Sequence, residues 1–128
     1  MVKYNFENLT VVITGAARGI GFAIAEAFAA QGAHPVIIDL NQQVVDEARQ
    51  KLKDMGYSVS GYVGDVTNSS QMEEVFSSII EERGKIDCLV NNAGITRDNL
   101  LLRMREEEWK MVLEINLTGT FICTQNVF

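Results

Sequence analysis

Two hydrophobic periods alternate along the chain, and this alternation constrains its fold more than any other feature. Short apolar and β-branched runs are separated by longer segments in which apolar residues recur every three to four positions. The first pattern is typical of strands and the second of amphipathic helices. A regular alternation of the two requires a parallel sheet covered by helices, with right-handed crossovers. The sequence therefore predicts an α/β fold.

Four runs are predicted to be strands, and three of them are so continuously apolar that we expect them to be covered on both faces. The predicted strands are Leu9–Thr14, Pro35–Asp39, Ser58–Val63 and Ile86–Val90. His34, the only histidine, precedes the second run and is expected to face solvent in a connecting turn.

Four segments between and after these runs are predicted to be helices: Gly19–Gln31, Gln42–Met55, Ser69–Arg83 and Glu106–Phe128. The first three are each followed by or end next to a glycine, which is a common helix stop. The last continues without a stop, and its predicted buried side consists of Trp109, Val112, Ile115, Gly119, Ile122 and Cys123. The predicted fold is a doubly wound parallel sheet of the Rossmann type, with four strands in the order β-α-β-α-β-α-β-α.

Composition excludes several classes of protein. A length of 128 residues fits one domain, and no apolar run reaches the roughly 18 residues of a membrane span, so no membrane partner is expected. An acidic pI near 4.7 argues against a nucleic-acid partner, which needs a basic face. Two separate cysteines and one histidine predict no metal site, and the absence of a secretory signal predicts a cytoplasmic protein.

A glycine-rich loop follows the first predicted strand, with the sequence Thr14-Gly15-Ala16-Ala17-Arg18-Gly19-Ile20-Gly21. Glycines let the chain turn tightly and let a ligand approach the backbone. The helix that follows directs its first N–H groups toward this loop, where a pyrophosphate would be stabilised. Such a loop can also be a glycine-rich turn without a ligand.

Asp39 ends the second predicted strand, where a carboxylate can hydrogen-bond the ribose of an adenosine. The alternative is that Asp39 caps the next helix. The glycine-rich loop and Asp39 together favour a dinucleotide as the ligand over a turn that binds nothing. Its charge would repel the 2′-phosphate of NADP(H), so NAD(H) is favoured, but Arg18 could pair with that phosphate and NADP(H) stays open.

Three further motifs lie after the later strands and in the last helix: Asp65-Val66, Asn91-Asn92-Ala93-Gly94 and Asn116-Leu117-Thr118-Gly119. With the glycine loop and Asp39, they resemble the short-chain dehydrogenase/reductase family over essentially the whole chain. The segment GITRDNLLLRMREEEW is most similar to bacterial 3-oxoacyl-acyl-carrier-protein reductases.

The resemblance implies a role for each matching residue. Gly15, Arg18, Gly19, Ile20 and Gly21 would form the cofactor loop, with the three glycines at the pyrophosphate. Asp39 would hold the ribose, Asp65 the adenine amino group, and Val66 would pack on the adenine ring. Asn91 would stabilise the central strand, and Ala93 and Gly94 would line the nicotinamide ribose. Asn116 would hold a water molecule in the catalytic proton relay, or else be a structural amide that bends its helix.

The implied activity is hydride transfer from NAD(P)H to a ketone carbonyl, with a 3-oxoacyl thioester on acyl carrier protein as the expected substrate, in fatty acid biosynthesis. The family also uses a serine and a Tyr-x-x-x-Lys motif, but no tyrosine here has a lysine four positions later. We therefore expect residues 1–128 to be a cofactor-binding half domain that ends inside a helix, before a fifth strand, and is inactive alone. The alternatives are an inactive nucleotide-binding module and a fragment that self-associates.

Two surfaces of such a half domain are predicted to promote a homo-oligomer. Without a fifth strand the fourth strand becomes an apolar edge, and the last helix would expose Ile115, Ile122, Cys123 and Val127. A local group of basic residues, Arg97, Arg103, Arg105 and Lys110, is interleaved with Glu106, Glu107 and Glu108. We interpret it as a solvated surface, with an acidic carrier protein as the alternative partner.

Overall fold

A parallel four-stranded sheet forms the centre of the computed structural model, which describes residues 3–95, 97 and 99–128. Its strands are β1 (Thr10–Thr14), β2 (His34–Asp39), β3 (Ser60–Val63) and β4 (Cys88–Val90), in the spatial order β3-β2-β1-β4. All neighbours pair in parallel, and the β1–β2 register runs from Thr10 opposite His34 to Thr14 opposite Ile38. The predicted α/β class and parallel sheet are confirmed.

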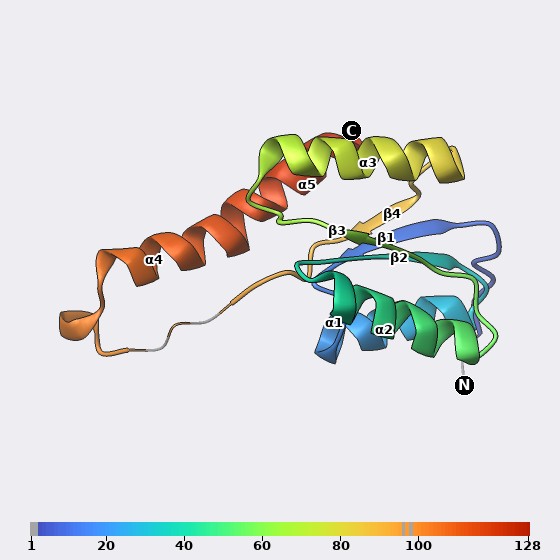
Figure 1. Cartoon of the computed structure of the whole chain (residues 1–128), viewed down its shortest axis with the longest axis horizontal. Helices are drawn as coiled ribbons and strands as arrows, with labels where there is room; N and C mark the ends of the chain where they lie inside the picture. The colour runs from blue at the N-terminus through green and yellow to red at the C-terminus, as the bar shows by residue number, and fades with distance from the viewer. Residues whose placement is uncertain (1–2, 96, 98) are drawn as a thin grey trace.

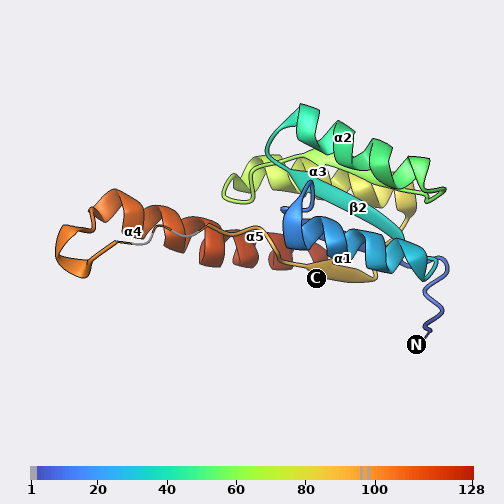
Figure 2. The same cartoon turned by 90° about the horizontal axis from the view of Figure 1, so that it is seen from below.

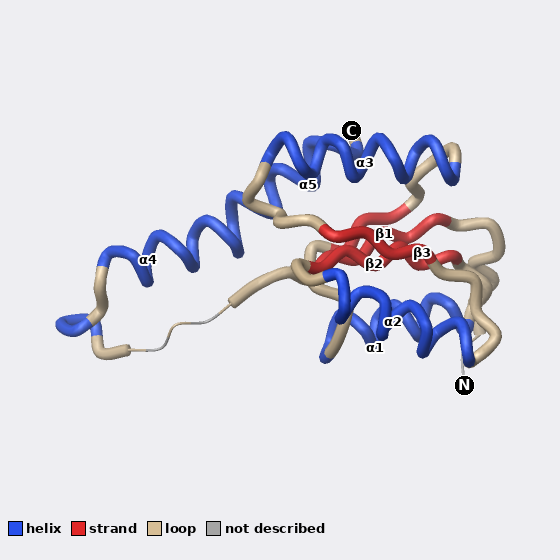
Figure 3. Tube along the Cα trace, viewed as in Figure 1, coloured by secondary structure: helices blue, strands red, loops and turns tan. Residues whose placement is uncertain are grey.

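Helices cover both faces of the sheet, as Figures 1 and 3 show. One face carries α1 (Gly19–Ala30) and α2 (Gln42–Asp54), and the other carries α3 (Ser69–Arg83) and α5 (Gly119–Val127). Asn side chains cap the N-termini of α2 and α3. Asn41 accepts hydrogen bonds from the N–H groups of Gln43 and Val44, and Asn68 accepts one from the N–H group of Gln71. Gly84, in the left-handed conformation at φ 82°, ends α3.

The sheet separates two hydrophobic clusters, one under each helical layer. The cluster on the α3–α5 side includes Val12, Val36, Ile38, Met72, Ile79 and Cys123. The cluster on the α1–α2 side includes Val11, Ile13, Ala25, Ile37, Ala48 and Leu52. Strand β1 is buried along its whole length, as its continuous apolar sequence predicts.

The last helical region, predicted as one helix over Glu106–Phe128, is interrupted by a turn of a different helix type. It begins with α4 (Glu106–Leu113), passes through a π-helical turn at Glu114–Thr118, and continues as α5. Figure 2 shows α4 and α5 following one another, with α4 extending well beyond the sheet. A 3₁₀ turn at Leu101–Arg103 lies in the segment that leads into α4.

The burial pattern of this region corrects two expectations. Ile122 and Cys123 are buried in the cluster with α3, as their place on the predicted buried side indicates. The expectation that a half domain would expose them, together with Ile115 and Val127, is wrong, because Ile115 and Val127 are half-buried against the same cluster. Trp109 was expected on the buried side but is exposed. The reason is that α3 covers only α5, while α4 extends away from the core.

Two further features of the sheet bear on the predictions. Strand β4 lies at the edge of the sheet, and its three residues are half-buried. His34 is the first residue of β2 and is buried, so its prediction as a solvent-facing turn residue was wrong. Within the described ranges, no helix is long and apolar enough to cross a membrane.

Candidate functional site

A crevice with a volume of about 120 Å³ opens at the carboxyl ends of the strands. Loops that follow β1, β2, β3 and β4 all contribute to it, which is where open α/β sheets place their ligands. Its lining brings together six residues predicted from the sequence: Gly15, Asp39, Asp65, Val66, Ala93 and Gly94. It also contains five that were not predicted: Ile38, Leu40, Gly64, Ile95 and Ile115.

The glycine loop packs closely against the loop after β4. A Cβ atom at Gly15 would lie 2.9 Å from Ala93 Cα, and one at Gly21 would lie 2.4 Å from the Gly15 carbonyl oxygen. Gly15 also has a positive φ of 63°, which side chains other than glycine rarely adopt. The lack of room for a Cβ atom therefore requires glycine at both Gly15 and Gly21. At Gly15 the backbone conformation requires it as well.

Thr14 and Asn92, which lie within the motifs but have no predicted role of their own, join these loops. Thr14 Oγ1 accepts hydrogen bonds from Asn92 N–H at 3.1 Å and Ala93 N–H at 3.0 Å. Asn92 Nδ2 donates to the Gly15 carbonyl oxygen at 3.0 Å. Two features of the sequence could have indicated these contacts. Thr14 is a polar residue at the end of an apolar strand, and Asn92 is a second asparagine beside Asn91.

Asp39 contacts the glycine loop directly. Its Oδ2 accepts a hydrogen bond from Ala17 N–H at 3.0 Å, and its Oδ1 accepts one from Leu40 N–H at 2.8 Å. The interpretation of Asp39 as a helix cap is wrong, because Asn41 caps α2. The half-buried carboxylate is instead held at the wall of the crevice, with its negative charge beside the loop.

Asp65 and Val66 also line the crevice, after the neighbouring strand β3. Asp65 Oδ1 accepts from Thr67 N–H at 2.9 Å and from the Thr67 hydroxyl at 2.7 Å, which fixes the turn after β3. Val66 is only 7% exposed, because most of its side chain packs in the core. Gly119 allows this packing, since a Cβ there would lie 2.6 Å from Val66 Cγ2.

Asn116 lies in the π-helical turn and holds the loop after β4. Its Oδ1 accepts from Ile95 N–H and its Nδ2 donates to the Ile95 carbonyl oxygen, both at 2.8 Å. A Cβ at Gly94 would lie 3.1 Å from Asn116 Oδ1, so Gly94 leaves room for this contact. These bonds agree with the alternative of a structural amide. π-turns are frequent at functional sites, and the role in proton transfer stays a prediction.

Six predicted residues lie outside the crevice lining: Gly21 and Asn116, described above, and Arg18, Gly19, Ile20 and Asn91. Arg18 and Gly19 are exposed at the start of α1, and Ile20 is 76% exposed there. Asn91 lies after β4, and its Nδ2 donates to Thr124 Oγ1 at 3.2 Å, so it connects the sheet to α5. The start of α1 therefore faces open space beside the crevice rather than forming its wall.

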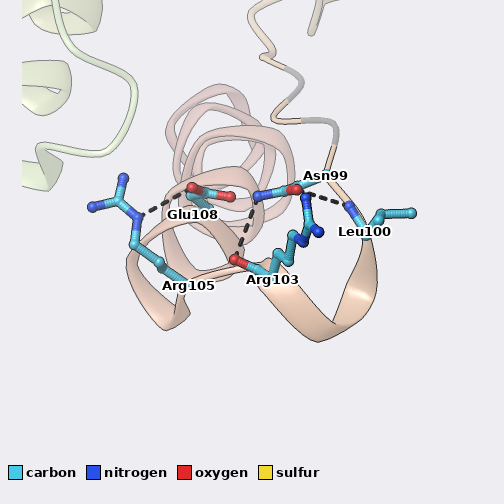
Figure 4. Close-up of polar contacts among 5 residues, drawn as sticks. All are labelled: Asn99, Leu100, Arg103, Arg105 and Glu108. Atoms are coloured by element: carbon cyan, nitrogen blue, oxygen red, sulfur yellow. Dashed lines mark hydrogen bonds and ion pairs between the residues drawn. The ribbon is translucent and has the colours of Figure 1, made fainter.

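The basic segment before and within α4 contains ion pairs with neighbouring glutamates, part of which Figure 4 shows. Arg105 Nε lies 3.2 Å from Glu108 Oε1, and Lys110 Nζ lies 3.8 Å from Glu106 Oε2. Asn99 accepts from Leu100 N–H at 2.9 Å and donates to the Arg103 carbonyl at 3.4 Å. The pairs agree with the interpretation of a solvated surface.

In the described part of the chain, neither Cys123 nor a cluster of acidic residues offers a further reactive centre. Burial raises the pKa of the Cys123 thiol to about 11, so it stays protonated. Among residues 3–95, 97 and 99–128, no group of three or more His, Cys, Asp or Glu side chains could hold a metal ion.

Comparisons with known proteins agree with this geometry. The chain is 43% identical over 121 residues to the 3-oxoacyl-acyl-carrier-protein reductase FabG of Thermotoga maritima, covering 94% of this chain and 49% of that protein. It is 44% identical over 118 residues to FabG of Escherichia coli, covering 91% of this chain and 47% of that protein. The chain thus spans about half the length of the curated relatives it matches.

Solved structures give the same result. The citronellol catabolism dehydrogenase AtuB of Pseudomonas aeruginosa superposes with a TM-score of 0.94 at 30% identity, covering 100% of this chain and 52% of that chain. An NAD⁺-bound xylitol dehydrogenase superposes with a TM-score of 0.92 at 30% identity, covering 97% and 48%. The model of the short chain dehydrogenase family matches residues 9–128. The chain therefore belongs to the short-chain dehydrogenase family.

Proposed function

We propose that this chain binds a nicotinamide dinucleotide in the crevice at the carboxyl ends of the strands. The observation that carries the proposal is the meeting of Gly15, Asp39, Asp65 and Gly94, from four separate loops, around one cavity. As an expectation from the family, residues 1–128 act as one cofactor-binding half domain.

The described residues fit such a ligand in shape and chemistry. The pyrophosphate would lie at the start of α1, where the first N–H groups of a helix have no intrahelical partner. A Cβ at Gly19 would meet nothing within 4 Å, so this side of the loop is open to a ligand. Asp39 would bind the adenosine ribose and Asp65 the adenine amino group. Ala93 and Gly94 would line the nicotinamide ribose.

We propose further that the chain is the cofactor half of a reductase of ketone carbonyls, with a 3-oxoacyl thioester on an acyl carrier protein as substrate. The support is 43% and 44% identity to two reductases that are named for this substrate. The bound cofactor would supply the hydride. In this chain, Asn116 is the one candidate for the proton relay, and no Tyr-x-x-x-Lys is present, so we propose that the chain alone does not turn over.

The choice between NAD(H) and NADP(H) depends on Asp39, and we propose NAD(H). A 2′-phosphate about 4 Å from this carboxylate would be repelled by about 4 kcal/mol per charge pair at an effective dielectric constant near 20. Arg18, exposed on the loop, is the one counter-charge on that loop and could reduce the repulsion.

Asp39→Asn tests this choice, because an amide can still accept from Ala17 N–H but carries no charge. We expect fluorescence titrations to show NADH binding more tightly than NADPH to the wild type, and the ratio to move toward NADPH by about tenfold or more in the variant. Asp46→Asn, an exposed neutralisation on α2, is the control and should leave the ratio unchanged. A wild type that prefers NADPH would contradict the proposal.

A second candidate function is self-association, and a specific surface favours it. Exposed apolar side chains recur about every four residues from α4 through the π-helical turn to α5, at Trp109, Leu113, Leu117 and Phe121. A groove on α5 is lined by Leu117, Thr120, Phe121, Thr124, Gln125 and Phe128. Contiguous apolar patches of this kind are typical of interfaces. We propose that this face, together with the β4 edge, pairs copies of the chain.

A further inference from the structure

Gln71 lies in the first turn of α3 and is not part of the crevice lining. It stands three residues after Asn68, the N-cap of this helix. At this position a Gln or Glu side chain ordinarily reaches back to the N–H of the N-cap residue, in the arrangement called a capping box. Here Gln71 Oε1 instead accepts a hydrogen bond from Asp65 N–H at 2.8 Å. The side chain therefore joins α3 to a residue that lines the crevice.

The turn that precedes α3 is rigid within itself. Asn68 N–H donates to the Asp65 carbonyl oxygen at 2.9 Å, so the N-cap N–H has a partner without Gln71. Asp65 Oδ1 accepts from the N–H and the hydroxyl of Thr67. Gln71 N–H donates to Asn68 Oδ1 at 3.0 Å, which attaches the end of the turn to the helix. The Gln71 side chain attaches its beginning.

Helix α3 is a fixed support for this turn. Met72, the residue after Gln71, is fully buried in the core cluster. A Cβ atom at Gly64 would lie 2.9 Å from Met72 Sδ, so the chain passes close to the helix just before Asp65. Gly64 N–H donates to the Asp39 carbonyl oxygen at 2.9 Å. The position of Asp65 is thus set relative to the core and to Asp39 across the crevice lining.

One oxygen of the Asp65 carboxylate is available to a ligand. Thr67 occupies Oδ1 twice, and no donor among the described residues binds Oδ2. A carboxylate only accepts hydrogen bonds, so its partner in the crevice must be a donor. The 6-amino group of adenine is such a donor. Hypoxanthine has an oxygen at the same position, and this oxygen would face the carboxylate without a hydrogen between them.

We infer that Gln71 is a positioning residue, which holds the Asp65 backbone against α3 and thereby sets the Asp65 carboxylate to distinguish a 6-amino purine from a 6-oxo purine. The inference rests on the proposed function, because it takes Asp65 to meet the adenine of the dinucleotide. Without Gln71 Oε1, the N–H of half-buried Asp65 loses its acceptor and turns toward another partner. The carboxylate moves with this backbone, and a shift of about 0.5 Å is enough to disturb a binding geometry.

Fluorescence titrations with NADH and with reduced nicotinamide hypoxanthine dinucleotide test the inference, because the two ligands differ only in the purine. We expect the wild type to bind NADH about tenfold more tightly. Gln71→Met keeps the length of the side chain but lacks the oxygen acceptor, and it should reduce this preference to about threefold or less, through weaker NADH binding. A role in the stability of α3 alone would weaken both dinucleotides equally and leave their ratio unchanged.

Further variants show whether the effect passes through Asp65. Gln71→Glu retains an oxygen acceptor and should keep the wild-type preference. Asp65→Ala should abolish the preference, and adding Gln71→Met to it should change the ratio no further. Gln50→Met, which makes the same substitution at an exposed position of α2, is the control and should keep the wild-type ratio.

The outcomes separate this inference from the proposed function. A tenfold preference that persists in Gln71→Met would overturn the inference while dinucleotide binding stands, and so would equal binding of both ligands by the wild type. A wild type that binds neither ligand would overturn the proposed function, and the inference with it. If Gln71→Met does not fold, Gln71→Asn gives the same test, because its amide is one methylene shorter and falls short of Asp65 N–H.

Discussion

Gly15 and Gly19 share one backbone conformation but differ in what surrounds them. Gly15 and Gly19 both have φ 63°, but a Cβ at Gly15 would collide with Ala93, whereas a Cβ at Gly19 would meet open space. Gly15 therefore serves the packing of two loops. Gly19 has no such packing role, and we propose that the open space beside it admits the cofactor.

This difference predicts the effect of Gly19→Ala. The positive φ should lower the free energy of unfolding by about 1 kcal/mol, because a side chain is strained in this conformation. NADH binding should weaken by about tenfold, since the new methyl group would stand where we place the pyrophosphate. Chemical denaturation and NADH fluorescence titration measure the two effects on the same samples.

Gly56→Ala is the matched control for this prediction. Gly56 has φ 90° and equally open surroundings, but it lies between α2 and β3, away from the crevice. It should lose similar stability and keep its NADH affinity. Equal binding by Gly19→Ala and the wild type would refute the assignment of Gly19 to the cofactor.

Helices and strands were predictable from the sequence where one hydrophobic period continued without a break. Helix α3 has the predicted bounds, Ser69–Arg83, because an Asn cap and a following glycine mark both ends. The π-helical turn at Glu114–Thr118 was not predictable from periodicity, because Asn116 binds Ile95 from a loop distant in the sequence. His34 was misplaced for a similar reason, since its partners are Ser60 in β3 and Ser58 in the segment before that strand.

The exposed face of α5 leads to a prediction about assembly. Phe121→Glu should raise the dissociation constant of self-association by about tenfold or more, because a charge would enter a desolvated apolar contact. Sedimentation equilibrium over a wide concentration range measures this change. Met55→Glu places the same charge on an exposed apolar residue at the end of α2, and it should have no effect. A wild type that stays monomeric throughout would exclude this interface.

At the scale of the whole molecule, parallel topology explains why so much of the candidate site could be predicted. Loops after parallel strands meet at one edge, so Gly15, Asp39, Asp65 and Gly94 had to come together once the strands were recognised. The contacts that hold these loops were not predictable. Thr14 and Asn92 act through hydrogen bonds across about 78 residues of sequence, which no local pattern reveals.

Residue-resolved titration of the ¹⁵N-labelled chain with NADH shows whether the crevice binds a nicotinamide dinucleotide. If it does, saturable amide shifts are expected at Gly15–Gly21, Asp39, Asp65–Val66 and Ala93–Gly94, with little change at His34 and Ser60 at the other end of the strands. Titration without saturable shifts would refute binding in the crevice, and so would shifts confined to the apolar groove of Tyr4, Phe6 and Phe28.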